Sequence, residues 1–253
     1  MFAFTEISEK LKNLIERQHE LTLGSTAIEH LIRKNEIGRA KETACFLHEI
    51  KKPLAVIRGL IYRCNAQTSP ELITETGKEI DVEISRAVKL LDDMTMITHL
   101  EVKPKDTQKI SFSKICESAF AQQQANFPSH RFCKKIEKKV EIRSSAEEAL
   151  MIAKNLLENA GKHTPANSKI NFSLKKSSSE IILKVEDNGK GFSKTDQKHI
   201  FTPFYKSGKN AGNGLGLTMA KYAVERLRGT IEIYSKKGVG SKFIVKIPIR
   251  TNF

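Results

Sequence analysis

His48 and Glu49 are adjacent residues whose side chains can act together on a substrate. An imidazole is a nucleophile, and a neighbouring carboxylate can accept its proton. The surrounding residues should form a helix, where neighbours point about 100° apart. With Ile50 on the apolar side, His48 is expected to face solvent. Zinc binding of the HExxH type is excluded, because the second histidine would have to stand where Lys52 does.

Pro53 lies in the same expected helix, five residues after His48. A proline inside a helix costs about 3 kcal/mol and leaves the carbonyl four positions earlier, that of Glu49, without its hydrogen bond. A helix defect beside an exposed histidine favours a chemical role over a packing role.

A second polar pattern lies on the helix expected at residues 146–161. Asn155, Asn159 and Lys162 recur at i, i+4 and i+7 and therefore share one face. Two amide oxygens and a cation suit a hydrated Mg²⁺ with its phosphates. A polar face that only meets water is the alternative, and the pattern by itself does not exclude it.

Two glycine-containing segments complete the set. Asp187 follows an expected strand and precedes Gly189 and Gly191, which allow a close backbone approach to a ligand, although a plain turn has the same composition. Residues 212–216, Gly-Asn-Gly-Leu-Gly, lead into a helix whose first N–H groups can bind phosphate. The spacing matches neither a Rossmann fingerprint nor a P-loop.

The elements that position these residues begin with a helical region over roughly the first hundred residues. A turn near residues 67–70, with Ser69 as N-cap and Pro70 at the first helical position, divides it into a hairpin. A four-helix bundle formed by two copies would bury the apolar stripes, and an intramolecular bundle with residues 1–35 is the alternative. The stripes step by three and four: Ile50, Leu54, Ile57, Ile61 and Cys64, then Ile80, Ile84, Ala87, Leu91, Met94 and Thr98.

From about residue 110 the pattern changes to short strands alternating with helices, which indicates an α/β sandwich. The predicted fold class is α+β: an N-terminal helical hairpin followed by this sandwich. The predicted domains are residues 1–35, 36–104 and 105–253. Strands are expected at 140–143, 169–174, 181–186, 230–234 and 242–247, and helices at 113–125, 146–161 and 215–228.

Charge and composition narrow the function further. Residues 1–109 hold 17 basic and 17 acidic residues, whereas residues 110–253 hold 26 and 12, so the whole excess of +14 lies in the second part. Scattered lysines with few aromatics favour a nucleotide or an acidic protein over nucleic acid as partner. No apolar run spans a membrane and no cysteine pair suggests a disulfide framework, which predicts a cytoplasmic chain.

The motifs occur in an order that resembles the histidine kinases of two-component signalling. The resemblance covers about residues 40–250 and implies a phosphoacceptor hairpin followed by a Bergerat-type ATP-binding domain. The matching segments are HEIKKPL (48–54, H box), NLLENAGKHT (155–164, N box), DNGKGF (187–192, first glycine box), IFTPFYK (200–206, F box) and GNGLGL (212–217, second glycine box).

The resemblance implies a role for each matching residue. His48 would be the phosphoacceptor, Glu49 would accept its proton, and Asp187 would accept a hydrogen bond from the adenine amino group. Asn159, supported by Asn155, would bind Mg²⁺. Residues 190–213 would form a lid over the nucleotide. The other nucleotide contacts would come from Lys162, His163, Gly189, Gly191, Lys206, Gly212, Gly214, Leu215 and Gly216.

The implied function is that of an ATP- and Mg²⁺-dependent protein-histidine kinase. A homodimer would phosphorylate itself on His48 and pass the phosphoryl group to the receiver-domain aspartate of a response regulator. An upstream sensor would be another protein or another part of a longer chain. A non-catalytic nucleotide-binding scaffold is the main alternative, and a serine kinase of the anti-sigma type would lack the hairpin.

Lys52 departs from the family pattern, which has Thr or Asn four residues after the histidine. That residue type positions water for dephosphorylating the partner, so the departure predicts a bias towards kinase activity. A lysine that pairs with Glu49 or only meets solvent is the alternative.

Overall fold

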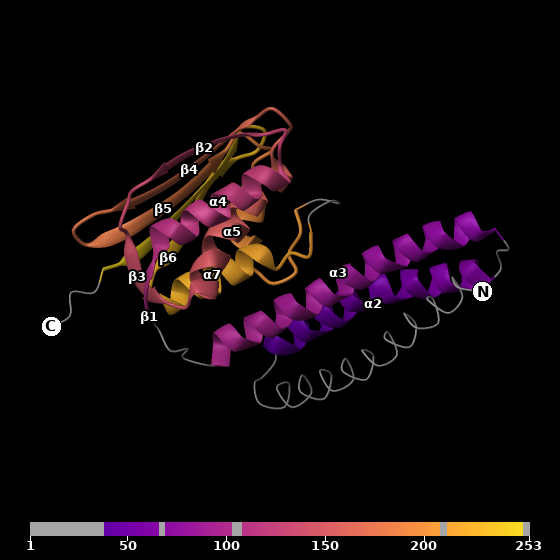
Figure 1. The fold of residues 1–253 in the computed structure, drawn as a ribbon. Helices are drawn as coiled ribbons and strands as arrows, with labels where there is room; N and C mark the ends of the chain where they lie inside the picture. Colours follow the sequence, from indigo (N-terminus) through magenta and orange to yellow (C-terminus); the bar gives the residue numbers. More distant parts are fainter. Residues whose placement is uncertain (1–37, 66–68, 103–107, 208–211, 250–253) are drawn as a thin grey trace. The chain divides into compact units, whose positions relative to one another are not determined.

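The computed structural model of the chain describes residues 38–65, 69–102, 108–207 and 212–249 (Figure 1). The chain divides into two compact units, with the boundary between Leu91 and Asp92. The N-terminal helical segment expected at residues 1–35 lies outside the described residues.

Two long helices confirm the predicted hairpin. They are α2 (Gly38–Asn65) and α3 (Pro70–Val102). Pro70 opens α3 as expected, and the backbone N–H of Ile73 donates to the carbonyl of Ser69 at 3.1 Å. Near the end of α2, Arg63 links the two helices, because its guanidinium donates a hydrogen bond to Glu79 of α3 at 2.7 Å.

The apolar seam of the hairpin differs from the predicted one by about one residue. Leu54, assigned to the seam, is 40% exposed, whereas the preceding Pro53 is buried. Pro53 therefore packs in the seam, which corrects the argument that its position favours a chemical role. Adjacent stripes on a wide apolar helix face share members, and spacing alone does not separate them. The buried positions are Thr43, Phe46, Pro53, Ile57 and Leu60 on α2, and Thr76, Ala87, Leu90 and Ile97 on α3.

The second unit holds a five-stranded sheet in the order β2-β4-β5-β7-β6, with β2 and β4 parallel and the other neighbours antiparallel. Its strands are β2 (Arg131–Ile136), β4 (Lys169–Lys176), β5 (Glu180–Asp187), β6 (Thr230–Lys236) and β7 (Gly240–Pro248). A separate antiparallel pair joins β1 (Gln108–Ser111) to β3 (Glu141–Ser144).

Three helices cover one face of the five-stranded sheet (Figure 1). They are α4 (Phe112–Asn126), α5 (Ala146–His163) and α7 (Gly216–Arg226). All strands and helices predicted from residue 110 onward are present, which confirms the α+β class, while β1, β2 and the short α6 (Lys194–His199) were not predicted.

Strand alternation explains how β5 delivers a functional side chain. Leu183, Val185 and Asp187 are buried while the residues between them are more exposed. Successive side chains on a strand point to opposite faces, so Asp187 lies on the helix-covered side where β5 ends.

The N-cap of α5 is Ser145, whose hydroxyl accepts from the N–H of Glu148.

A buried ion pair joins α5 to α7. The carboxylate of Glu148, which is 4% exposed, lies 3.0 Å from the Nε of Arg226 and also accepts from the Ser144 hydroxyl at 3.3 Å. We expect Glu148→Gln to lower the free energy of unfolding by about 2 kcal/mol, because it removes the charge from the carboxylate that lies 3.0 Å from a mostly buried guanidinium.

Urea unfolding followed by circular dichroism measures this loss. Glu141→Gln is the matched control, because Glu141 forms an exposed pair with Lys109 at 2.7 Å. Such surface pairs contribute about 0–1 kcal/mol. Equal losses for the two variants would show that burial of the Glu148 pair adds nothing.

Candidate functional site

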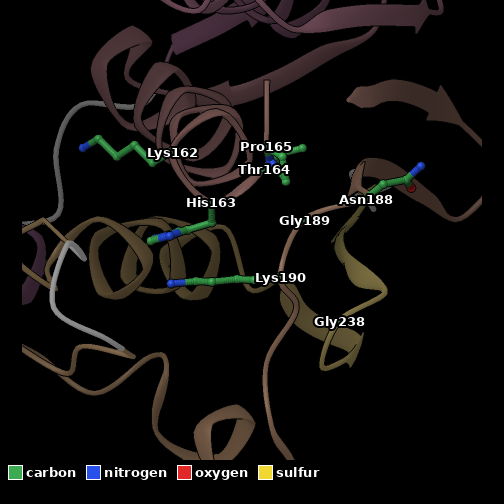
Figure 2. Close-up of a pocket in the computed structure, with 8 residues that line it drawn as sticks. All are labelled: Lys162, His163, Thr164, Pro165, Asn188, Gly189, Lys190 and Gly238. Atoms are coloured by element: carbon green, nitrogen blue, oxygen red, sulfur yellow. The ribbon is translucent and has the colours of Figure 1, made fainter. Parts of the chain in front are cut away.

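A cleft of about 510 Å³ opens where the C-terminal end of α5, the segment after β5 and the β6–β7 turn meet (Figure 2). Its basic side is formed by Lys162, His163 and Lys190. The remaining lining residues are Thr164, Pro165, Asn188, Gly189 and Gly238.

His163 is the most perturbed group of the cleft. Burial, together with the charges of Lys190 and Lys162, lowers the pKa of the imidazole to about 4. His163 is therefore neutral near pH 7, and the positive charge of the cleft comes from the two lysines. Two cations around a neutral hydrogen-bonding ring suit an anionic ligand such as a polyphosphate.

Asp187 and Thr164 form a buried polar pair beside the cleft. Asp187 is 5% exposed, and its Oδ1 accepts from the backbone N–H of Gly189 at 2.8 Å. Burial raises the pKa of Asp187, which this backbone donor partly opposes. The Thr164 hydroxyl is buried next to this carboxylate and, like the Gly189 N–H, favours its ionised form. A carboxylate and a hydroxyl at one buried place suit a ligand that offers a hydrogen-bond donor.

Thr164 had no predicted role, although it lies within the N-box segment. Its position directly after the last residue of α5 is the feature that could have indicated a role for Thr164. His130 supports the same backbone, because its Nε2 lies 2.9 Å from the Thr164 carbonyl oxygen.

Two glycines bring the walls of the cleft together. A Cβ on Gly189 would lie 2.4 Å from the carbonyl oxygen of His163, and one on Gly191 would lie 2.2 Å from that of Lys236. Gly191 also has a φ of +59°, which side chains disfavour. The close approach in the structure is therefore between backbone segments that form the cleft, and the expected approach to a ligand stays a prediction.

The polar face of α5 lies against the start of α7. The Asn155 amide donates to the Met151 carbonyl at 3.0 Å, and its Oδ1 would lie 2.9 Å from a Cβ on Gly216. Asn159 is half-buried, one turn further on. Lys162 pairs with Glu158 on the same helix.

The second glycine segment contributes backbone rather than side chains. Leu215 is fully buried and caps α7 without a side-chain hydrogen bond, so it is a core residue. Gly214 has a φ of +71° and packs against the backbone of Phe204. A Cβ on Gly212 would lie 3.7 Å from the Lys162 ammonium. The segment therefore adjoins the basic side of the cleft.

The predicted lid, residues 190–213, is described apart from 208–211. It includes α6, and Lys206 is half-buried near its described end.

In the other unit, His48 is exposed on α2, as predicted, and Glu49 pairs with Lys52. This ion pair with Glu49 is the alternative to a role of Lys52 in biasing the protein towards kinase activity.

Metal binding by carboxylates or histidines alone has no support in the described residues, since no three such groups cluster. Mg²⁺ would instead use amide oxygens together with phosphates. Among the described helices, no stretch combines the length and apolar character that a membrane crossing requires.

Comparison with known proteins agrees with this geometry. The family described as "Histidine kinase-, DNA gyrase B-, and HSP90-like ATPase" matches residues 145–251. Sensor histidine kinase YclK of Bacillus subtilis is 29% identical over 234 residues, covering 86% of this chain and 48% of YclK. AtoS of Escherichia coli, a signal transduction histidine-protein kinase, is 29% identical over 210 residues, covering 80% of this chain and 33% of AtoS.

Solved structures show the same fold. Histidine kinase AdeS of Acinetobacter baumannii has a TM-score of 0.63 at 20% identity, covering 81% of this chain and 98% of that one. Histidine kinase ThkA in complex with response regulator protein TrrA has a TM-score of 0.64 at 20% identity, covering 82% and 61%.

The sheet, its helical layer and the cleft define a Bergerat-type ATP-binding domain. With the hairpin that precedes this domain, the chain is similar to sensor histidine kinases over more than four fifths of its length. It spans about half, or less, of the length of the curated relatives that it matches.

Proposed function

We propose that the chain is an ATP-dependent protein-histidine kinase that phosphorylates itself on His48 and passes the phosphoryl group to a response-regulator aspartate. The observation that supports this most directly is an exposed His48, with Glu49 next to it, on a helical hairpin in the same chain as an ATP-binding domain.

At the nucleotide end, the Asp187 carboxylate and the Thr164 hydroxyl would hold the adenine amino edge. The lysines of the cleft, Lys162 and Lys190, would neutralise phosphate charge. Mg²⁺ would bind Asn159, with Asn155 in support, and would supply further charge neutralisation on the phosphates.

At the phosphoacceptor end, a ring nitrogen of His48 would attack the γ-phosphorus of ATP, the bond from that phosphorus to the bridging oxygen would break, and ADP would leave. Glu49 would accept the proton that the imidazole loses. Lys52 is exposed, so its pairing with Glu49 contributes only about 0–1 kcal/mol. We expect the Glu49 carboxylate to turn from Lys52 to the histidine during transfer.

The proposed domain division is a hairpin at residues 36–104 and an ATP-binding domain at 105–253. Exposed apolar side chains on the hairpin support homodimerisation into a four-helix bundle. They are Leu47, Leu54 and Val56 on α2, and Leu72 and Val82 on α3. The ThkA–TrrA complex supports a response regulator as the phosphoryl acceptor.

Incubation with Mg²⁺ and ATP labelled at the γ-phosphate tests the proposal. A histidine kinase acquires a label that is lost in acid and kept in base, because phosphohistidine contains a P–N bond. A protein that binds ATP and acquires no label would be a nucleotide-binding scaffold, which is the competing function.

Lys52 provides a further prediction about the reverse reaction. Its ammonium can donate hydrogen bonds but cannot accept one from an attacking water, so it cannot orient that water. We expect Lys52→Thr to speed the dephosphorylation of the phosphorylated regulator by about tenfold. Lys51→Thr is the matched control, because Lys51 is the exposed neighbour. Equal decay rates with the parent protein and with Lys52→Thr would contradict this bias.

A further inference from the structure

Asp196 on α6 is the centre of a hydrogen-bond network. With Ser193 it forms a capping box: the Asp196 N–H donates to the Ser193 hydroxyl at 3.0 Å, and the Ser193 N–H donates to Asp196 Oδ2 at 3.1 Å. The Ser193 hydroxyl also lies 2.6 Å from Oδ2. Oδ2 of Asp196 therefore accepts the hydrogen bonds of Ser193 that cap the start of α6.

The second oxygen reaches out of α6. Asp196 Oδ1 accepts from the Tyr205 hydroxyl at 2.6 Å, and the Tyr205 ring packs on His199. Hydrogen bonds from Ser193 and then from Tyr205 lower the pKa of Asp196 to about 2, and the Ser207 hydroxyl contributes in the same direction. The Asp196 carboxylate is ionised near neutral pH, so the hydroxyls of Ser193 and Tyr205 both donate to it.

The backbone that this network holds is strained. Phe204 has a φ of +63°, in the left-handed region that residues with a side chain disfavour. Its N–H donates to the Gly214 carbonyl at 3.0 Å, and the Tyr205 N–H donates to the Thr202 carbonyl at 3.1 Å. A strained conformation persists only where its surroundings determine it. The Asp196–Tyr205 hydrogen bond is one of those determinants.

The same short segment is tied to the cleft from its other side. Lys190, which lines the cleft, donates through its ammonium to the Ser207 carbonyl at 3.1 Å. Lys206 therefore stands between Tyr205, held by α6, and Ser207, held from α6 and from the cleft wall.

We propose that Asp196 is a positioning residue for phosphoryl transfer: through Tyr205 and Ser207 it holds Lys206 beside the basic side of the nucleotide cleft. This inference rests on the proposed kinase function. Asp196 itself does not touch the nucleotide. Its loss would leave ATP bound but its terminal phosphate poorly placed, because a small misplacement of a catalytic contact is enough to slow a reaction greatly.

Tyr205→Phe is the test variant, because it removes one hydroxyl and keeps the ring, the backbone and the capping box. We expect the single-turnover rate of autophosphorylation at saturating ATP to fall by about tenfold or more. ATP affinity, measured by calorimetry, should change by less than about threefold, which is the pattern expected when binding is kept and the transition state is affected. Asp196→Asn should show the same split.

Tyr234→Phe is the matched control. Tyr234 also donates to a carboxylate, that of Glu232 at 2.9 Å, but on the exposed face of the sheet. It should leave both the rate and the affinity unchanged.

A double variant separates positioning from general stability. In a Lys206→Met background, Tyr205→Phe should cause little further loss of rate, because the group to be positioned is gone. The inference is overturned if Tyr205→Phe labels at the parent rate, if the rate loss follows a fall in ATP affinity, or if the losses multiply in the double variant. A parent protein that forms no phosphohistidine at all would instead refute the proposed function.

Discussion

Replacement of His48 by glutamine is expected to abolish phosphohistidine formation while leaving ATP binding within about twofold, since separate sites rarely couple more strongly. His48 is exposed on α2 and does not line the nucleotide cleft. Glutamine keeps polarity and approximate size but has no nucleophilic ring nitrogen. The measurement is the acid-labile, base-stable label from γ-labelled ATP, with calorimetry for ATP affinity.

Two further variants sharpen this result. Glu49→Gln should bind ATP normally and transfer phosphate about 10²-fold more slowly, as loss of a general base predicts. Arg58→Gln changes an exposed residue ten positions after His48 on α2 and should have no effect. Full labelling of His48→Gln would show that the phosphoacceptor is another residue.

Asp187→Asn is expected to weaken ATP binding by about 10²-fold or more, because a site built around a buried acceptor rejects a poor match strongly. The carboxylate can only accept hydrogen bonds, whereas an amide offers two donors in its place. Adenine carries an amino donor where guanine carries a carbonyl. The parent protein should therefore bind ATP in preference to GTP, as calorimetry with both nucleotides will measure.

Folding should survive this change. The asparagine oxygen can still accept from the Gly189 N–H, so the turn after β5 is retained. Burial raises the pKa of Asp187, so burying the ionised carboxylate costs stability at pH values above its folded pKa. A neutral asparagine removes that cost, and the melting temperature at pH 7 should be equal or higher.

Glu186→Gln is the control for Asp187→Asn. Glu186 is the preceding residue on β5, and its carboxylate lies 3.5 Å from the Lys242 ammonium at the protein surface. It should keep full ATP affinity. Unchanged affinity in Asp187→Asn, or equal binding of GTP by the parent, would contradict the adenine assignment.

The elements that the sequence missed have identifiable physical reasons. The edge strand β2 carries several exposed charged side chains and shows no regular alternation of burial, so no period of two appears. The pair of β1 and β3 involves only four residues from each strand. The helix α6 buries no side chain and depends on its capping box rather than on an apolar face.

The sequence by itself determined what local spacing encodes. Periods of two and of three to four identified the strands and helices of the core, and Asp187 was recognised as the acid that follows the strand at residues 181–186. Motif order indicated the resemblance to histidine kinases, and His48 was recognised as exposed. Each of these properties depends on residues within a few positions of one another.

Only the tertiary structure decided which distant residues meet. It selected Pro53 rather than Leu54 for the hairpin seam, paired Glu148 with Arg226, and buried the Thr164 hydroxyl next to Asp187. Residues far apart in sequence share no regular spacing, so the spacing of residues along the chain does not predict these contacts. They exist because the packing of helices against the sheet brings the groups within hydrogen-bond distance.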